Sequence, residues 1–236
     1  MGRSMASELT FASLTKTAEA IWDGKITSLE LTEHIIRRIE RHNPVLNAIV
    51  TFTKTEAIAQ AKAADEALAK GEVLGSLHGV PITIKDCFEV AGVRTTAGAK
   101  RLSDHVPEED AATVSRLREA GAVILGKTNV PIYAGDWQSF NVVFGTTNNP
   151  WNLDVTPGGS TGGGAAAVAA GLSYLSMGSD IGGSIRIPST FCGLYGHKPT
   201  INILPYRGTY PGGTLPSSPS RGPSPGAPRT SNFPWR

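Results

Sequence analysis

Apolar residues in the first part of the chain recur with the spacing of amphipathic helices. Residues 13–23 carry this pattern, and Gly24 ends it. Thr27 and Glu30 then form a capping-box pattern in front of a second, longer helical stretch. We expect the Asn-Pro pair at residues 43–44 to end that helix, because proline disrupts a helix interior. The apolar face of the second helix consists of Leu31, Ile35, Ile36 and Ile39.

Short apolar segments farther along the chain predict strands. They are LNAIVTF at 46–52, GVPITIKD at 79–86 and AVIL at 122–125. An alanine-rich helix is predicted over about residues 55–70, and another helix should begin with Asp110 as its N-cap and run through Glu119 to Gly121. Helices that alternate with short buried strands predict an α/β fold, layered around a mostly parallel sheet.

Two glycine-rich turns, at residues 156–164 and 179–188, each present a serine. Glycines cluster where the backbone must approach another group closely or take up a positive φ, so two such turns indicate a site. Ser160 lies in the first turn and Ser184 in the second, where a helix is expected to start with Pro188 in its first turn. Free N–H groups at a helix start are suited to bind an oxyanion.

The serines need a base, and Lys85 at the end of the strand 79–86 is the candidate. A lysine at a strand end is more often a solvated surface charge. The presence of two serines in glycine-rich turns makes a role as their base the preferred interpretation here. A Ser–His–Asp triad is not indicated, because no histidine lies near either serine in the sequence and the nearby carboxylate is that of Asp180. Cys87 and Cys192 are far apart and lack metal spacing, so we expect no metal site and no disulfide framework. We interpret Cys87 as a packing residue, with a reactive thiol as the alternative.

Residues 121–128, GAVILGKT, match the phosphate-loop pattern letter for letter. That motif requires a loop between its glycines and a helix directly after the lysine. Here the spacer is a predicted strand, and Asn-Val-Pro at 129–131 opposes an immediate helix. We therefore reject nucleotide binding at this position and interpret Lys127 as a structural or site-rim residue.

Two further alternatives concern the first glycine-rich turn. PGGSTGGGAAA at 157–167 has the character of a phosphate-cradling loop of small-molecule kinases. That interpretation leaves the motifs at 180–186 and 79–86 unexplained. In the plainest alternative, both turns are tight sheet corners, but this does not account for a serine in each.

Six segments of the chain resemble the amidase signature family of serine hydrolases, in the family's order and spacing. They are GVPITIKD, TTAG at 95–98, AGAVILGKTN at 120–129, TNNPW at 147–151, PGGSTGGGAAA, and SDIGGSIRIPSTFCGLYGHKPT at 179–200. The resemblance extends from about the first helix to Thr200. It implies an α/β/α sandwich around a mixed, mostly parallel sheet, a small-molecule amide as substrate, and no cofactor.

The resemblance also implies a role for each candidate residue. Ser184 corresponds to the nucleophile, and Ser160 to a bridging serine that follows a cis peptide bond. Lys85 corresponds to the terminal base, which must be a neutral amine, a form that burial favours. An amidase of this kind cleaves a carboxamide C–N bond through an acyl-enzyme on Ser184.

Residues next to the nucleophile are expected to support it. Backbone N–H groups for the oxyanion would come from Ile181, Gly182, Gly183 and Ser184. Asp180 and Arg186 carry opposite charges on either side of this turn, and we predict that they pair and brace it. Thr161 occupies a place where many relatives carry a second serine, and its hydroxyl keeps the hydrogen-bonding capacity.

Two branches of the family compete for this chain. One comprises free-standing amidases, and the other is the amidotransferase subunit that supplies ammonia to misacylated tRNA. The latter typically contains DTGGSIRQP, and MDEFAMGSS after the TN dipeptide, where this chain has DIGGSIRIP and VPIYAGDWQSFN. Ile181 and Ile187 favour an apolar acyl or aryl amide, and hence the amidase branch.

Composition and charge narrow the class of protein. The chain has 236 residues, 40% of them hydrophobic, and no apolar run of membrane-spanning length. Its first residues lack the apolar core of a signal peptide, so we expect a cytoplasmic protein without a membrane partner. The net charge of +2 comes from four arginines in the acid-free stretch 201–236, and nothing indicates a nucleic-acid surface. We leave a homodimer open as the assembly.

The last part of the chain departs from the family pattern, which continues well beyond Thr200. Residues 1–204 are expected to form the N-terminal part of an amidase signature domain, with a sheet that is incomplete at the C-terminus. Eight of the sixteen prolines fall within residues 205–236, which we expect to be a disordered tail. A truncated or frame-shifted product, and thus an inactive fragment, is the corresponding alternative for function.

Overall fold

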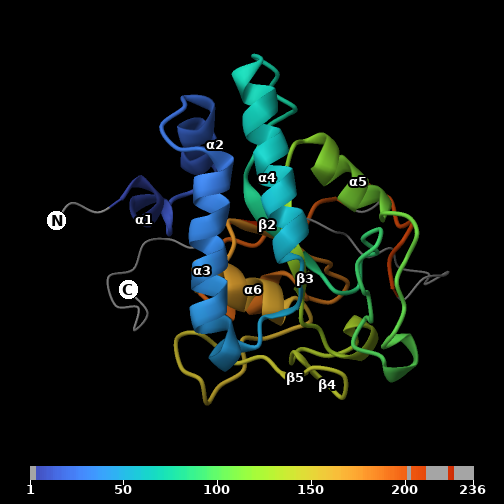
Figure 1. The fold of residues 1–236 in the computed structure, drawn as a ribbon. Helices are drawn as coiled ribbons and strands as arrows, with labels where there is room; N and C mark the ends of the chain where they lie inside the picture. Colours follow the sequence, from blue (N-terminus) through green and yellow to red (C-terminus); the bar gives the residue numbers. More distant parts are fainter. Residues whose placement is uncertain (1–3, 201–202, 211–222, 226–236) are drawn as a thin grey trace.

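A five-stranded mixed sheet forms the centre of the computed structural model, which describes residues 4–200, 203–210 and 223–225 (Figure 1). The strands lie in the order β1, β3, β2, β6, β7. The three central strands are parallel to one another, and the two outer strands are antiparallel to their neighbours. The strands of this sheet are β1 (Ile49–Phe52), β2 (Pro81–Lys85), β3 (Val123–Thr128), β6 (Leu175–Met177) and β7 (Pro223–Pro225).

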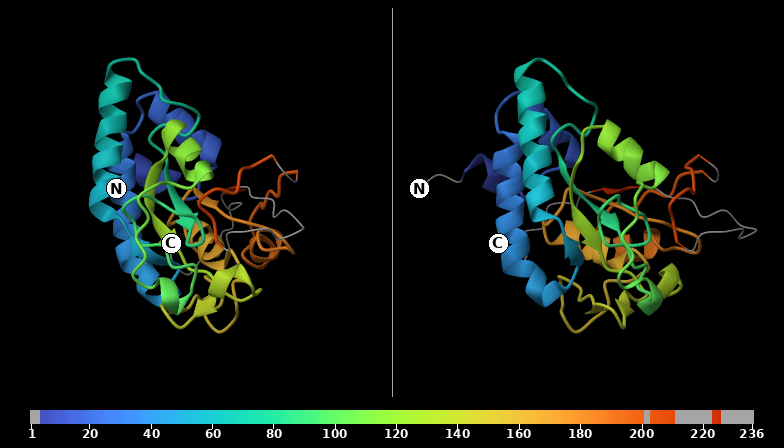
Figure 2. Two further views of the ribbon diagram at one scale, coloured as in Figure 1. Left: turned by 90° about the vertical axis from the view of Figure 1, so that its right-hand side faces the viewer. Right: turned by 45° about the vertical axis from the view of Figure 1, so that its right-hand side comes forward.

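Helices cover both faces of this sheet, which confirms the predicted α/β/α arrangement. The long helices α3 and α4 lie side by side over one face, and α6 and α7 lie on the other side of the strands (Figures 1 and 2). The helices are α1 (Met5–Leu9), α2 (Leu14–Trp22), α3 (Ser28–Leu46), α4 (Lys54–Ala69), α5 (Ala112–Glu119), α6 (Gly162–Ala169) and α7 (Arg186–Phe191). Two short 3-10 turns, η1 (Lys100–Leu102) and η2 (Ile132–Ala134), and a small hairpin of β4 (Phe140–Asn141) and β5 (Gly145–Thr146) lie in the loops. No helix in the described part of the chain has the length and apolarity needed to cross a bilayer.

The helix α3 begins as predicted but continues past the point where we expected it to end. The Thr27 hydroxyl accepts the N–H of Glu30 at 3.0 Å. Pro44 lies inside the helix, which ends at Leu46. The reason is Asn43, whose carbonyl oxygen Oδ1 accepts the N–H groups of Ala48 and Ile49 at 3.0 and 2.9 Å. These bonds hold the chain that leaves the helix, so the last turn persists despite the proline.

Asp110 does not cap α5, contrary to expectation. The cap position belongs to Ala111, which offers no side-chain hydrogen bond. The Asp110 carboxylate instead accepts the N–H of Ala91 and the Nε–H of Arg118, both at 2.8 Å. The carboxylate is thus already bonded to a backbone N–H of the neighbouring loop and to a side chain of the helix, and it does not bond the N–H groups of the first turn of α5.

The strand β3 runs through the residues that match a phosphate-loop motif. Gly126, Lys127 and Thr128 are strand residues, so the predicted strand is confirmed and the loop and helix that the motif requires are not formed here. Gly126 has a φ of +146°, and a Cβ at this position would collide with the carbonyl oxygen of Thr51 on β1. Lys127 is completely buried, so it does not lie on an exposed rim of the site.

Parts of the stretch 205–236 lie against the main body. The Tyr210 N–H donates to the carbonyl oxygen of Cys87 at 2.8 Å, and Glu89 N–H donates to Gly208 O at 2.8 Å. Residues 223–225 form β7, which pairs with β6, whereas the sequence predicted no strand there. The remaining expectations for the tail fall on residues 211–222 and 226–236, which lie outside the described residues.

Candidate active site

The site begins with Lys85, the last residue of the central strand β2. All five residues of this strand are buried, and the Lys85 side chain is fully buried among them. Its Nζ lies 2.7 Å from the Oγ of Ser160. The structure thus brings together a lysine and a serine that are 75 positions apart in the chain.

Ser160 lies on the glycine-rich turn that leads into α6. It is fully buried and follows Gly159 through a cis peptide bond. A Cβ on Gly159 would lie 2.7 Å from the carbonyl carbon of Trp137, so this position requires glycine. Ser139 braces the turn from the side of β4: its hydroxyl donates to Gly158 O at 3.1 Å and accepts the N–H of Gly162 at 3.0 Å.

Ser184 lies on the second turn, between β6 and α7, and is 8% exposed. The two turns are joined by a backbone hydrogen bond from Thr161 N–H to Ser184 O, at 3.0 Å. Among the described residues, no hydrogen bond links the hydroxyls of Ser160 and Ser184. Catalytic hydrogen bonds often form or tighten only when a substrate is bound.

Asp180 organises the backbone of the second turn. Its buried carboxylate forms an ion pair with Arg186, with both Nε and Nη2 of the guanidinium at 3.0 Å, which agrees with the predicted pair. It also accepts the N–H groups of Gly183, Ile185 and Arg186 at 2.7, 3.1 and 3.2 Å. Burial alone would raise the pKa of Asp180, but Arg186 and these three N–H groups hold the pKa at about 2.

The predicted set of oxyanion donors needs one correction. The N–H of Gly183 is committed to Asp180, because the carboxylate lies directly beneath the turn. The N–H groups of Ile181, Gly182 and Ser184 have no acceptor among the described residues. A Cβ on Gly182 would meet nothing within 4 Å, and Ile181 is 47% exposed, so the turn opens toward solvent at this point. An anionic oxygen can approach these three donors.

Ser179 is a residue of the site that the sequence analysis missed. Its Oγ lies 2.8 Å from the Nζ of Lys85, so the lysine contacts two hydroxyls. The sulfur of Cys87 lies 3.7 Å from the same Oγ. Cys87 is completely buried, as expected of a packing residue, and both cysteines are free. Thr161 keeps the predicted hydrogen-bonding role, because its hydroxyl donates to Ser179 O at 3.4 Å.

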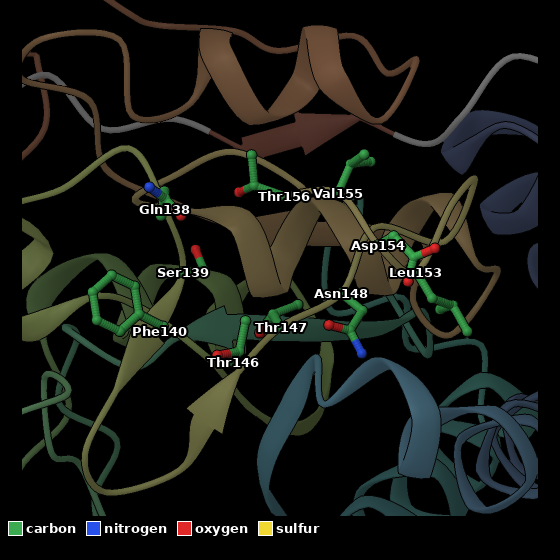
Figure 3. A pocket seen from close by; sticks show the side chains of 10 residues that line it. All are labelled: Gln138, Ser139, Phe140, Thr146, Thr147, Asn148, Leu153, Asp154, Val155 and Thr156. Atoms are coloured by element: carbon green, nitrogen blue, oxygen red, sulfur yellow. The ribbon is translucent and has the colours of Figure 1, made fainter.

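A cavity of about 220 Å³ lies beside the first turn, and Figure 3 shows the side chains around it. Its lining comes from β4, β5 and the loop 153–156, and includes Ser139 but neither Ser160 nor Ser184. In the part of the chain that the structure describes, no group of three or more histidine, cysteine, aspartate or glutamate side chains is arranged to hold a metal ion.

Comparisons with known proteins agree with this geometry. The amidase family model matches residues 30–223. The A subunit of the glutamyl-tRNA(Gln) amidotransferase of Moorella thermoacetica is 47% identical over 193 residues, which are 82% of this chain and 40% of that protein. Its counterpart from Carboxydothermus hydrogenoformans is 45% identical over 197 residues, 84% of this chain and 41% of that protein. The chain thus spans about two fifths of the length of these relatives.

Solved structures of amide-cleaving enzymes have the same fold. A structure of fatty acid amide hydrolase matches with a TM-score of 0.89 and 30% identity, over 95% of this chain and 40% of that one. A bacterial aryl acylamidase of the amidase signature family matches with a TM-score of 0.86 and 34% identity, over 92% of this chain and 45% of that one.

Proposed function

The chain belongs to the amidase, or amidase signature, family, and we propose that it hydrolyses a carboxamide C–N bond through an acyl-enzyme on Ser184. The observation that carries this proposal is the buried contact of 2.7 Å between Lys85 Nζ and Ser160 Oγ, on a turn that is hydrogen-bonded to the Ser184 turn. A serine hydroxyl is a weak nucleophile until a neighbour takes its proton, and this arrangement offers a route for that proton.

In the first half of the reaction, Ser184 Oγ attacks the carbonyl carbon of the amide. Its proton passes to Ser160 Oγ while the Ser160 proton passes to the neutral amine of Lys85, which becomes an ammonium. The carbonyl oxygen becomes an oxyanion, which the N–H groups of Ile181, Gly182 and Ser184 would bind. Each such donor stabilises the transition state by about 3 kcal/mol.

The tetrahedral intermediate then collapses. The C–N bond breaks, and the leaving nitrogen receives the proton that returns from Lys85 through Ser160. The product amine or ammonia departs and leaves an ester on Ser184. Water, deprotonated along the same route, attacks this ester, releases the carboxylate and restores the Ser184 hydroxyl.

The rim of the site supports an amide with an apolar acyl or aryl group. Ile181, beside the nucleophile, is 47% exposed, and Ile187 follows on the first turn of α7. Neighbours in the structural comparison include a fatty acid amide hydrolase and an aryl acylamidase. These features favour the amidase branch that the sequence analysis preferred.

The amidotransferase branch is the second candidate. The relatives at 45–47% identity are amidotransferase subunits, which supports hydrolysis of a polar primary amide that supplies ammonia to a partner. A cytoplasmic location and a homodimer stay predictions.

The test is a panel of amides offered to the purified chain, with glutamine, hexanamide, benzamide and an anilide as substrates. Release of ammonia or aniline is followed between pH 5 and pH 10, so that the range includes conditions in which Lys85 is neutral. Ser184→Ala is the control. Hydrolysis of the apolar amides that disappears in the control supports the amidase branch, whereas preference for glutamine supports the second candidate. A folded chain that releases no more product than Ser184→Ala from any of these amides contradicts both.

A further inference from the structure

A second buried lysine lies on the strand beside the candidate base (Figure 1). Lys127 of β3 is completely buried, and its Nζ is 3.3 Å from Oδ1 of Asp86, the residue that follows Lys85. The strands β2 and β3 are parallel here, with Lys85 opposite Thr128. The reaction proposed above uses neither Asp86 nor Lys127, although the pair adjoins its base.

Two threonine hydroxyls complete the hydrogen bonding of this pair. The Nζ of Lys127 donates to Thr95 Oγ1 at 2.6 Å. The second carboxylate oxygen of Asp86 accepts the N–H and the hydroxyl of Thr96, at 3.1 and 2.5 Å. All four residues are fully buried. The cluster is thus two charged groups of opposite sign, sealed from water and held by neutral donors and acceptors.

Asp86 also fixes the backbone next to Lys85 through hydrogen bonds of its own main chain. Asp86 N–H donates to Thr128 O on β3, and Asp86 O accepts the N–H of Ala97, both at 3.0 Å. Lys85 O accepts the N–H of Phe88 at 3.0 Å, which closes the turn after the strand. The end of β2 is therefore tied to β3 and to the loop that carries Thr95 and Thr96.

A buried ion pair of this kind contributes little net stability, because desolvation of the two charges offsets their attraction. An isolated buried charge, by contrast, strongly changes the protonation of groups near it. Burial lowers the pKa of Lys127, and Asp86 opposes that shift. As long as the two charges balance, Lys85 experiences no net charge from the neighbouring strand.

We propose, on the basis of the function proposed above, that Asp86 and Lys127 are positioning residues for the base: the pair fixes the end of β2, and its balanced charge keeps an uncompensated buried charge away from Lys85. Among the described residues, the charges of Cys87 and Glu89 also act on Lys127. The Asp180–Arg186 pair lies on the turn after β6. None of these groups changes in the variants below.

The test compares how fast a fluorophosphonate probe labels the protein between pH 5 and pH 10. Labelling requires the neutral form of Lys85, so its rate rises with pH through a midpoint. Lys127→Met leaves the Asp86 carboxylate with its hydrogen bonds from Thr96 but without a cation. For groups roughly 10 Å apart at an effective dielectric constant of about 20, one uncompensated negative charge moves the midpoint up by about one pH unit.

Two further variants separate charge from structure. Asp86→Asn combined with Lys127→Met has no charge in the cluster, and its midpoint should return to that of the unchanged protein. Thr95→Val removes a hydrogen bond but no charge, and it should leave the midpoint unmoved even where it slows labelling. An unmoved midpoint in Lys127→Met, or a double variant displaced by a full pH unit, overturns the proposal. If Lys127→Met does not fold, Lys127→Gln takes its place: it removes the same charge but keeps a polar group beside Asp86, and the same upward shift of the midpoint is expected, whereas an unmoved midpoint overturns the proposal.

A wild-type chain that the probe does not label would refute the proposed function, but the effect of the pair on the titration of Lys85 can still be tested. In that event the free energy of unfolding is measured as a function of pH for four proteins: the unchanged chain, Lys127→Met, Lys85→Met and the variant with both of these substitutions. The free-energy difference between a protein with Lys85 and the same protein carrying Lys85→Met depends on pH around the titration midpoint of Lys85. The inference stands if Lys127→Met raises that midpoint by about one unit, and it fails if the midpoint is the same in both.

Discussion

The carboxylate of Asp180 is expected to hold the Ser184 turn chiefly through backbone N–H groups, and only secondarily through Arg186. It accepts three backbone N–H groups at 2.7 to 3.2 Å and is itself fully buried. The Arg186 side chain is 56% exposed, so water screens its part of the ion pair. Asp180→Ala should therefore cost far more than Arg186→Ala.

The expected sizes follow from these contacts. Removal of one partner of a buried, hydrogen-bonded charge pair typically costs about 3–5 kcal/mol of unfolding free energy. The pKa of Asp180, which burial would raise but the same contacts lower to about 2, shifts with the matching sign: the folded protein favours the ionised carboxylate. We expect about 3 kcal/mol for Asp180→Ala and about 1 kcal/mol or less for Arg186→Ala, as for other partly exposed pairs. Because the folded-state pKa is depressed, this stabilisation is present above about pH 4 and is lost as the pH falls toward 2.

The assay is urea denaturation at pH 7 of both single variants and of the double variant, together with the rate of fluorophosphonate labelling of Ser184. The double variant should resemble Asp180→Ala, since Arg186 has no carboxylate left to contact there. Labelling should fall at least about 100-fold in Asp180→Ala, because small displacements of a catalytic group are costly, and by less than about tenfold in Arg186→Ala. Equal and small losses of stability in both single variants would refute the view that the backbone contacts dominate.

Three further predictions concern other parts of the molecule. Burial, together with the charge of Arg38, lowers the pKa of His34 to about 4, so stability should decline as the pH falls from about 6.5 to 4, and His34→Asn should remove most of this decline in thermal melts. Ser179→Ala should slow probe labelling by about tenfold without a loss of fold in circular dichroism, since Lys85 keeps its contact with Ser160. Gly163→Ala should cost more than about 3 kcal/mol in denaturant unfolding, because its Cβ would collide with the backbone of residues 129 and 48, whereas Gly182→Ala, which meets nothing within 4 Å, should cost less than about 1 kcal/mol. Equal costs for the two glycines would contradict the packing argument.

Hydrophobic periodicity predicted several of the elements, and the family resemblance predicted the main contact of the site. The apolar stripe of α3 and the runs that became β2 and β3 predicted where these elements lie. Lys85 and Ser160 were predicted to meet through the family resemblance, and their atoms lie 2.7 Å apart. The predictions of helix ends were wrong where a polar side chain forms hydrogen bonds with groups outside its own helix. Asp110 binds a loop N–H and an arginine instead of its own helix, and Asn43 lets α3 continue past a proline.

The same limit explains the differences within the site. The N–H of Gly183 points to Asp180, and this follows from the path of the turn, which residue identities do not specify. Ser179 escaped notice because it precedes the glycine motif, and only the parallel pairing of β2 with β6 brings it next to Lys85. Contacts of this kind depend on tertiary structure and have no signature in a single sequence.

The central claim is that Ser184 is a nucleophile activated by Lys85 through Ser160. The most direct test is to treat the purified chain with a fluorophosphonate probe and to locate the adduct by peptide mass spectrometry, with Ser184→Ala and Lys85→Met in parallel and circular dichroism of all three. We predict one adduct, on Ser184, that is absent from Ser184→Ala and at least about 1,000-fold slower to form in Lys85→Met. An adduct on another residue, or labelling of Ser184 that does not depend on Lys85 in folded proteins, would contradict the account.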